Sequence, residues 1–261
     1  MQLLGQETVF TRKLHDTARL QPQRVVYAEG GHPSMMKAAV QAKAEGICFP
    51  ILLGNPDRIN RQAQRLKLDL SGIKIIDMRA DKEQGRRATY AKHLAEKLAR
   101  KGYTFQEAYD KMYERNYFGM MMVERGDADA FITGLYTKYS NTIKVATEVV
   151  GVREGFHTFG TMHVVNSQKG TYFIADTLIN RHPDNNFLVD IARLSANTVE
   201  FFNEKPVMAM ISYSNFGTDE IGSPLKVHEA VEELHANYPN LIVDGEMQVN
   251  FALNREMRDE K

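Results

Sequence analysis

Short apolar runs alternate with amphipathic segments along most of the chain. The runs at 25–28, 47–54, 73–77 and 128–134 have the length and residue types of strands. Helical patterns separate them, and the polar loop 29–34 follows the first run directly. A strand, loop, helix and strand in that order predict a parallel βαβ unit. The alternation therefore predicts an α/β protein whose mainly parallel sheets are covered by helices on both faces.

Start signals refine the helical segments. Thr104 and Glu107 have capping-box spacing, so we expect one helix from there to about Arg125. Asn141 is the expected N-cap of a later helix. Helical periodicity covers residues 35–45, 57–66, 81–100, 104–125, 141–150, 183–202 and 224–237.

The alternation is interrupted once. Two strand patterns, 161–166 and 172–176, are joined by a short polar turn and predict a hairpin. The change of rhythm indicates a seam near 137–152. We expect two three-layer α/β/α domains, residues 1–144 and 145–261, with a cleft between them.

The most informative stretch is 207–222. Its apolar start, 207–211, predicts a strand buried on both faces. A polar loop follows at 212–218, and Ser223-Pro224 has the pattern of an N-cap followed by proline at the first helical position. Such loops place hydroxyl and N–H groups at the carboxyl edge of a sheet, where α/β proteins bind anions. The alternative is that turns simply favour these residues. The candidate ligand contacts in the loop are Ser212, Ser214 and Asn215.

Carboxylates follow two other strands. Asp244 and Glu246 close the apolar run 241–243, and Asp176 follows 172–175. At strand ends these acids could serve acid–base chemistry or orient a ligand. The alternative is a turn with solvated acids.

Composition excludes several classes of function. The 33 basic and 33 acidic side chains cancel, so net charge indicates no nucleic-acid or membrane partner. The single Cys48 allows no internal disulfide, and its apolar surroundings predict a buried thiol. The 8 histidines show no metal-ligand spacing. The sequence contains no dinucleotide-binding fingerprint, no Walker phosphate loop and no nucleophile-elbow motif. We expect no signal peptide, no transmembrane helix and a cytoplasmic location.

Four motifs stand out along the chain: 172–177, 192–197, 206–217, and 244–248 with Ala252-Leu253. Together they resemble a known family, the phosphate acetyl/butyryl transferases. The resemblance runs from about Arg24 to Asn254 and implies two α/β/α domains, dimerisation through the second domain and a coenzyme A thioester site. One segment, 116–130, and the Ser-Asn-Phe-Gly form of the central loop resemble the transferase-like C-terminal domain of bacterial hybrid malic enzymes.

The sequence departs from the family pattern where anions would be held. The family's Thr-Leu-Arg-Pro is Thr142-Ile143-Lys144-Val145 here, which keeps a charge but loses the bidentate fork. The first loop, 29–34, lacks an acid and an arginine, and Leu98 stands where the family carries another arginine. The family also continues beyond the position of Lys261 into a segment with a Ser-Arg catalytic pair. We expect either a fragment or a domain that has lost this segment.

Three functions follow from the resemblance. The first is a regulatory and dimerisation module of a hybrid malic enzyme that binds acetyl-CoA or coenzyme A without efficient transferase activity. The second is an active phosphate acyltransferase in which Lys144 binds phosphate and Ser212 or Ser214 orients the acyl group. The third is a structural dimerisation module. Catalytic residues stay unassigned, and the expected ligand contacts are Thr142, Lys144, Asp176, Ser212, Ser214, Asn215, Asp244 and Glu246.

Partners and cofactors complete these expectations. We expect a small thioester or phosphate as ligand, and a homodimer or higher homo-oligomer. No intrinsic cofactor or metal is expected in this chain. NADP and a divalent metal would belong only to a malic enzyme domain outside this sequence.

Overall fold

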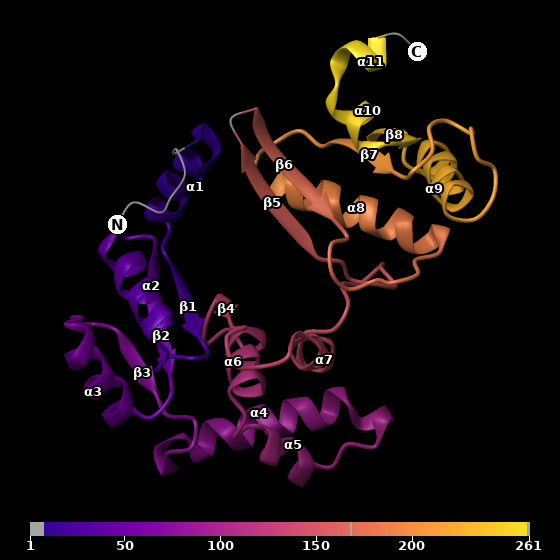
Figure 1. The fold of residues 1–261 in the computed structure, drawn as a ribbon. Helices are drawn as coiled ribbons and strands as arrows, with labels where there is room; N and C mark the ends of the chain where they lie inside the picture. Colours follow the sequence, from indigo (N-terminus) through magenta and orange to yellow (C-terminus); the bar gives the residue numbers. More distant parts are fainter. Residues whose placement is uncertain (1–7, 168, 260–261) are drawn as a thin grey trace. The chain divides into compact units, whose positions relative to one another are not determined.

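The computed structural model describes residues 8–259 except residue 168 (Figure 1). It divides into two compact units, the first ending at Gly151 and the second beginning at Val152. The boundary predicted between residues 144 and 145 falls inside helix α7 (Tyr139–Val149). This helix belongs to the first unit because Val145 and Val149 are buried in its core.

The first unit is built on one parallel sheet. Its strands lie in the order β3-β2-β1-β4, and every pairing is parallel, so the predicted βαβ unit is confirmed. Two short 3-10 turns, at 81–83 and 99–101, flank α4. Besides α7, the elements are α1 (Val9–Leu20), β1 (Gln23–Tyr27), α2 (Pro33–Ala44), β2 (Cys48–Leu53), α3 (Pro56–Leu66), β3 (Lys74–Ile76), α4 (Gln84–Lys97), α5 (Phe105–Lys111), α6 (Arg115–Glu124) and β4 (Ala130–Ile132).

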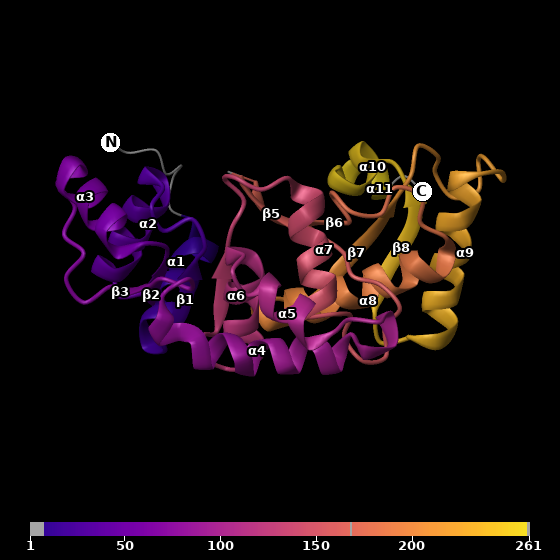
Figure 2. The same ribbon diagram turned by 90° about the horizontal axis from the view of Figure 1, so that it is seen from below.

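Alternate residues of the strands enter two different cores. Val26 and Leu53 pack with residues of α4 to α7 on one face of the sheet. Their neighbours Tyr27 and Leu52 pack with residues of α2 and α3 on the other face (Figures 1 and 2). Period-two alternation in a sheet covered on both sides produces this division. The first unit is therefore the predicted three-layer α/β/α arrangement.

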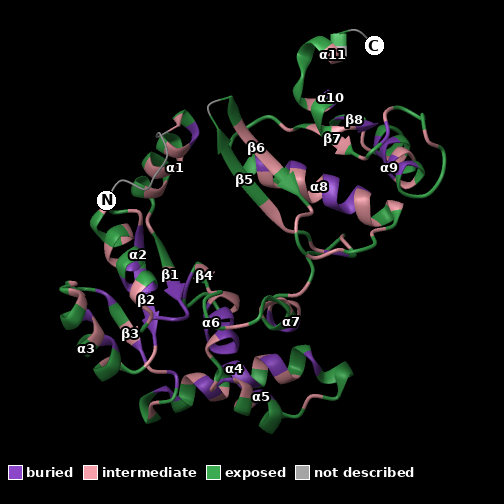
Figure 3. Cartoon of the chain, viewed as in Figure 1, coloured by how far each residue is buried: buried purple, intermediate pink, exposed green. Residues whose placement is uncertain are grey.

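The long helix predicted from Thr104 is wrong in its extent. The capping box of Thr104 and Glu107 is present and opens α5, but that helix ends at Lys111. Its last turn tightens, and the extended backbone of Glu114 then starts α6 in a new direction. All seven residues from Asn116 to Met122 are buried, as the core colouring of α6 shows (Figure 3). A helix surrounded on all sides has no amphipathic stripe, so periodicity could not locate the break.

The predicted cap of α7 is also wrong. The helix begins at Tyr139 with Lys138 as its N-cap, and the N–H of Asn141 already donates to the Lys138 carbonyl at 3.0 Å. Asn141 therefore lies within the first turn.

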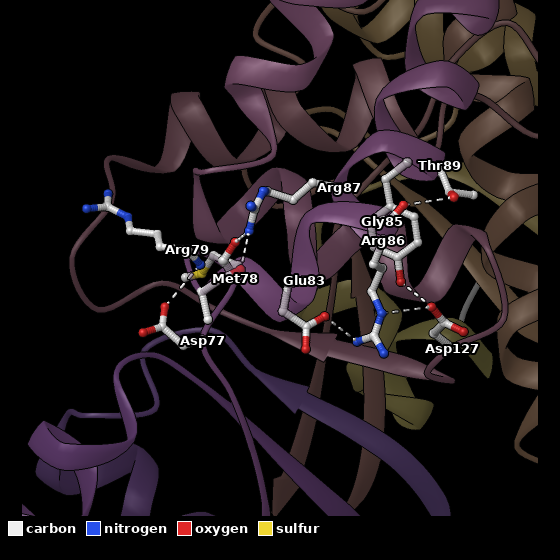
Figure 4. A network of polar contacts seen from close by, with 11 residues as sticks. Asp77, Met78, Arg79, Glu83, Gly85, Arg86, Arg87, Thr89 and Asp127 are labelled. Carbon is white, nitrogen blue, oxygen red and sulfur yellow. Dashed lines mark hydrogen bonds and ion pairs between the residues drawn. The ribbon is translucent and has the colours of Figure 1, made fainter.

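A polar network holds the connection between β3 and α4 (Figure 4). The buried Arg87 donates from Nη1 to the carbonyls of Met78 at 2.6 Å and Ala80 at 2.8 Å. The neighbouring Arg86 pairs with Glu83 at 3.3 Å and reaches Asp127 at 3.9 Å. Arg87 thus donates to two backbone carbonyls of this connection, and Arg86 joins two of its neighbouring carboxylates.

The second unit contains a hairpin and a separate pair of parallel strands (Figure 1). Strands β5 and β6 pair antiparallel, which confirms the predicted hairpin. Helices α8 and α9 pack with β7 and β8 around a small core that includes Val189, Ala230 and Leu234. The elements are β5 (Met162–Ser167), β6 (Gly170–Ala175), α8 (Asn185–Phe201), β7 (Val207–Ile211), α9 (Ser223–Asn237), β8 (Ile242–Met247), α10 (Val249–Leu253) and α11 (Arg255–Asp259).

Strand β7 is not buried on both faces as predicted. Met208 and Met210 pack against the core, whereas Val207 is 71% exposed and Ile211 is 45% exposed. Within the described chain β7 pairs with β8 alone, and α8 and α9 cover one face. A continuous apolar run cannot distinguish a strand covered on two sides from one with a bare apolar face.

Two boundaries in this unit also differ from the predictions. Gly222, rather than Ser223, is the N-cap of α9. The acids Asp244 and Glu246 lie within β8 instead of after it, because the pairing with β7 continues to Met247 through an irregularity at Met210/Ile211. No helix of the described part of the chain is long and apolar enough to cross a membrane.

Candidate ligand-binding site

The loop after β7 is folded around a buried carboxylate. The side chain of Glu246 in β8 is fully buried, and its Oε1 accepts a hydrogen bond from the Gly217 N–H at 2.6 Å. The Ser214 hydroxyl lies 3.4 Å from the same oxygen, and the Glu246 carbonyl accepts from the Phe216 N–H at 2.9 Å. Hydrogen bonds to an ionised acceptor are stronger than neutral ones. Glu246 therefore determines the shape of the loop.

Further contacts close the loop on itself. The hydroxyls of Ser214 and Thr218 lie 2.8 Å apart, and the Asn215 Oδ1 accepts from the Gln248 N–H at 2.8 Å. Phe216 and Gly217 both have positive φ, at 46° and 77°. Glycine adopts this conformation without steric cost, whereas a phenylalanine must be held there by its surroundings. The Phe216 ring packs edge-on against Phe251, with 5.5 Å between centroids.

The loop brings together three of the predicted ligand residues. Ser214, Asn215 and Glu246 form one hydrogen-bonded cluster. Ser212 begins the loop, and its N–H donates to the Met247 carbonyl at 3.0 Å. Its hydroxyl oxygen is buried and has no hydrogen-bond partner among the described residues. This orphan hydroxyl gives the loop spare hydrogen-bonding capacity.

Asp244 does not join that cluster. Its side chain is exposed, and its Oδ1 accepts from the N–H of the next residue, Gly245, at 2.9 Å. In the strand register it lies beside Ala209, which is also exposed. The two acids of the Asp-Gly-Glu sequence therefore have different surroundings, one in solvent and one in the interior.

Asp176 forms a second polar centre in this unit, at the end of β6. Its Oδ1 accepts from the N–H and hydroxyl of Thr161 at 2.8 and 2.6 Å, and its Oδ2 accepts from the Asn180 N–H at 2.7 Å. Burial opposes its ionisation, but these hydrogen bonds outweigh burial and lower the pKa of Asp176. It is thus an ionised acid that ties the hairpin to the segment before α8.

The first unit has a comparable buried acid at the carboxyl edge of its sheet. Glu29 follows β1 and is 1% exposed. Its Oε1 accepts from the Thr133 hydroxyl at 3.0 Å and from the N–H groups of Gly134 and Leu135 at 3.2 and 3.3 Å. Glu29 therefore joins the ends of β1 and β4, where open α/β sheets place their ligand loops.

The remaining predicted contacts, Thr142 and Lys144, lie on α7. Thr142 is half-buried, and the Lys144 side chain is 64% exposed, with its Nζ 3.9 Å from Glu148 Oε1. Glu148 is buried and accepts from the hydroxyls of Tyr117 at 2.5 Å and Tyr103 at 3.3 Å. Burial and the adjacent carboxylate raise the pKa of both tyrosines, so they stay protonated and donate. Lys144 is thus a solvent-accessible cation beside an anchored acid.

Glu148 and His228 also contact these residues, and neither was predicted from the sequence as a site residue. Glu148 lies one helical turn after Lys144, and an i,i+4 spacing could have indicated it. His228 on α9 places its Nδ1 3.4 Å from Glu246 Oε2. No local pattern connects His228 with Glu246, because they belong to different elements that only packing brings together. Among the described residues, no group of three or more histidine, cysteine, aspartate or glutamate side chains could hold a metal ion.

The geometry defines a class of protein. It is an α/β protein of two compact units in which polar loops at strand ends are organised by buried carboxylates. The chain belongs to the phosphate acetyl/butaryl transferase family, which matches residues 9–261. The resemblance inferred from the sequence motifs is thereby confirmed.

Individual relatives divide between two kinds of protein. The chain is 32% identical over 254 residues to the NADP-dependent malic enzyme of Escherichia coli K12, covering 97% of this chain and 34% of that protein. It is 29% identical over 238 residues to the phosphate acetyltransferase of Bacillus subtilis 168, covering 91% of this chain and 72% of that protein. It is therefore a phosphotransacetylase-like domain related both to malic enzyme and to phosphate acetyltransferases.

A solved structure shares the fold. The EutD phosphotransacetylase from Staphylococcus aureus superposes with a TM-score of 0.84 at 26% identity, covering 97% of this chain and 76% of that one. The chain spans about a third of the length of the malic enzymes that it matches. The superposition on the solved phosphotransacetylase confirms the predicted α/β fold class.

Proposed function

We propose that this domain binds acetyl-CoA or coenzyme A as a regulatory and dimerisation module of a malic-enzyme-type protein, without efficient transferase activity. The observation that carries the proposal is the loop 212–218, held in a defined shape by the buried Glu246. Polar side chains at the surface of the loop, Asn215 and Thr218, suit the amides and hydroxyls of a pantetheine chain, which need no strong catalytic group. The similarity to malic enzymes over 97% of the chain supports the regulatory setting.

Weak transferase activity follows from the anion contacts. Transfer between coenzyme A and phosphate requires cations that stabilise charge in the transition state. Lys144 offers a point charge on a 64% exposed side chain that lies beside Glu148. A lysine lacks the two parallel hydrogen bonds that an arginine gives to a phosphate. Binding of the thioester depends less on that fork than the transfer step does.

The second candidate is an active phosphate acyltransferase. The solved phosphotransacetylases and the curated phosphate acetyltransferases among the relatives favour it. In this alternative Lys144 binds phosphate, and Ser212 or Ser214 orients the acyl group. The Ser212 hydroxyl has no hydrogen-bond partner among the described residues, although its oxygen is buried.

Dimerisation is proposed through the bare face of the β7–β8 pair. Val207 and Ile242 are register partners and are 71% and 44% exposed, and Ile211 continues the same row. Exposed apolar side chains on one face, here interrupted by Asp244 beside Ala209, are costly in water and suit an interface between copies.

Calorimetric titration of the purified chain with acetyl-CoA, beside an acetyl phosphate formation assay, tests the proposal. We expect binding in the titration and no turnover in the assay. Turnover would establish the second candidate. Absence of both would reject ligand binding by this chain and leave a structural module.

A further inference from the structure

We propose that His228 is a positioning residue for the ligand loop. It holds a proton on Nδ1 that faces Glu246 Oε2 and so fixes the carboxylate around which the 212–218 loop folds. The expected effect on thioester binding rests on the function proposed above, whereas the effect on loop geometry does not.

The first observation is a pair of buried atoms without hydrogen bonds. Glu246 Oε1 has the Gly217 N–H, but Oε2 has no hydrogen-bond partner in the part of the chain that the structure describes. The same is true of His228 Nδ1. These two atoms lie 3.4 Å apart, within ion-pair distance if the imidazole is protonated. An unpaired oxygen of a fully buried carboxylate is costly, and a small rotation of the ring would supply its donor.

The second observation is the orientation of the imidazole. Helix α9 is held against β8 by Ala230 and Leu234, which are buried in the core with Val243. The His228 side chain is 42% exposed, and its outer nitrogen, Nε2, lies 3.5 Å from Glu232 Oε1. The ring therefore stands between a buried and a solvent-exposed carboxylate. A donor is required on the buried side, where water cannot replace it.

Loss of the His228 donor would affect the loop through the Glu246 side chain. If the Glu246 carboxylate turns, its Oε1 leaves the Gly217 N–H, and the contact with Ser214 changes with it. Phe216 and Gly217 hold positive φ values that depend on this anchor. His228 therefore acts on the ligand loop without belonging to it.

Three variants separate positioning from simple packing. His228→Asn keeps a donor near the Nδ1 position, His228→Leu removes the donor at similar volume, and Glu246→Gln removes the charge. His182→Leu, at an exposed histidine of the same unit, is the matched control. All four are compared with the unmodified chain by circular dichroism melting, so that loss of fold is detected.

The first readout uses no ligand. We expect the nitrogen spectrum of His228 to show a protonated Nδ1, and the Gly217 amide resonance to move in His228→Leu but to stay in His228→Asn and His182→Leu. A spectrum with the proton on Nε2 alone, or an unmoved Gly217 amide in His228→Leu, would overturn the inference.

The second readout is acetyl-CoA titration. We expect His228→Leu to bind about tenfold or more weakly and His228→Asn to bind within about threefold of the unmodified chain. Equal weakening by both variants would assign His228 a packing role and reject positioning. If the unmodified chain does not bind acetyl-CoA, the proposed function fails, but the Gly217 resonance still decides the inference.

Discussion

At the residue scale, three buried glutamates connect segments that lie apart in the sequence. Glu29, Glu148 and Glu246 each accept hydrogen bonds from groups that lie elsewhere in the sequence. Hydrogen bonds to a carboxylate are directional, whereas apolar contacts are not. Each glutamate therefore sets the relative position of the segments that it connects. Two of the candidate ligand groups lie beside these anchors, Lys144 beside Glu148 and Ser214 beside Glu246.

Lys144 is the residue on which the anion contact depends. We expect Lys144→Ala to weaken coenzyme A binding about tenfold or more, because a charge-assisted hydrogen bond contributes about 1.5–3 kcal/mol. Lys144→Arg should retain or tighten binding, since it adds the bidentate fork. Titration calorimetry measures both, with Lys92→Ala at an exposed position of α4 as control. The same loss of affinity in Lys144→Ala and Lys92→Ala would remove Lys144 from the site.

The ion pair of Arg24 and Asp129 makes a prediction about pH. Hydrogen bonds from the Arg24 side chain and N–H lower the pKa of Asp129 from 3.8 to about 2. Because the pKa of Asp129 is lower in the folded state than in the unfolded chain, the ion pair stabilises the folded state at a pH above the unfolded-state pKa. This stabilisation is lost as the pH falls from about 4 towards 2. Asp129→Asn should therefore lower the urea midpoint at pH 7, and the difference from the unmodified chain should shrink below pH 4.

The control for that experiment is Asp16→Asn, because Asp16 is 66% exposed and pairs with Arg19 at 3.7 Å. Exposed pairs of this kind contribute little. A difference between Asp129→Asn and the unmodified chain that stays constant down to pH 3 would contradict the assigned role of the pair.

At the element scale, α6 is the central helix of the first unit. It is buried on all sides, so its residues are selected by space rather than by an amphipathic pattern. Gly119 lies where a Cβ would come within 2.3 Å of the Phe131 ring and 3.1 Å of Leu53. The close approach of α6 to β4 and β2 thus requires a glycine.

Gly119→Ala should therefore destabilise the protein by about 1–3 kcal/mol, the usual effect of overpacking. Gly85→Ala in α4 is the matched control, because its added Cβ would meet nothing within 4 Å. That change should be neutral or stabilise by up to about 1 kcal/mol. Urea denaturation measures the free energy of unfolding of both variants. Equal changes in the two would show that the side chains around Gly119 rearrange to accept the added methyl group.

At the scale of the whole molecule, the bare face of β7 and β8 bears on assembly. We expect light scattering to give about twice the chain mass of 29.7 kDa. Val207→Glu combined with Ile211→Glu should produce a monomer, because charges buried at an interface are costly. Leu20→Glu, at an 87% exposed position of the first unit, is the control. A dimer that survives the double change would place the interface elsewhere.

Local sequence patterns were enough to predict most of the elements and the family. The hairpin and the capping box at Thr104 depend on contacts between residues close in the sequence, and the βαβ unit on the order of its elements, all of which a local pattern records. The motifs that resemble the family were recognisable for the same reason. Ser214, Asn215 and Glu246 could be predicted as site residues because the sequence pattern places them at the ends of apolar runs.

Tertiary structure alone decided which of these features meet and which face solvent. The break between α5 and α6, the exposed row on β7 and the approach of His228 to Glu246 have no local signal. The reason is physical. Burial of apolar surface and pairing of buried charges depend on which segments pack together. The spacing of residues along the sequence does not encode how close two such segments lie in space.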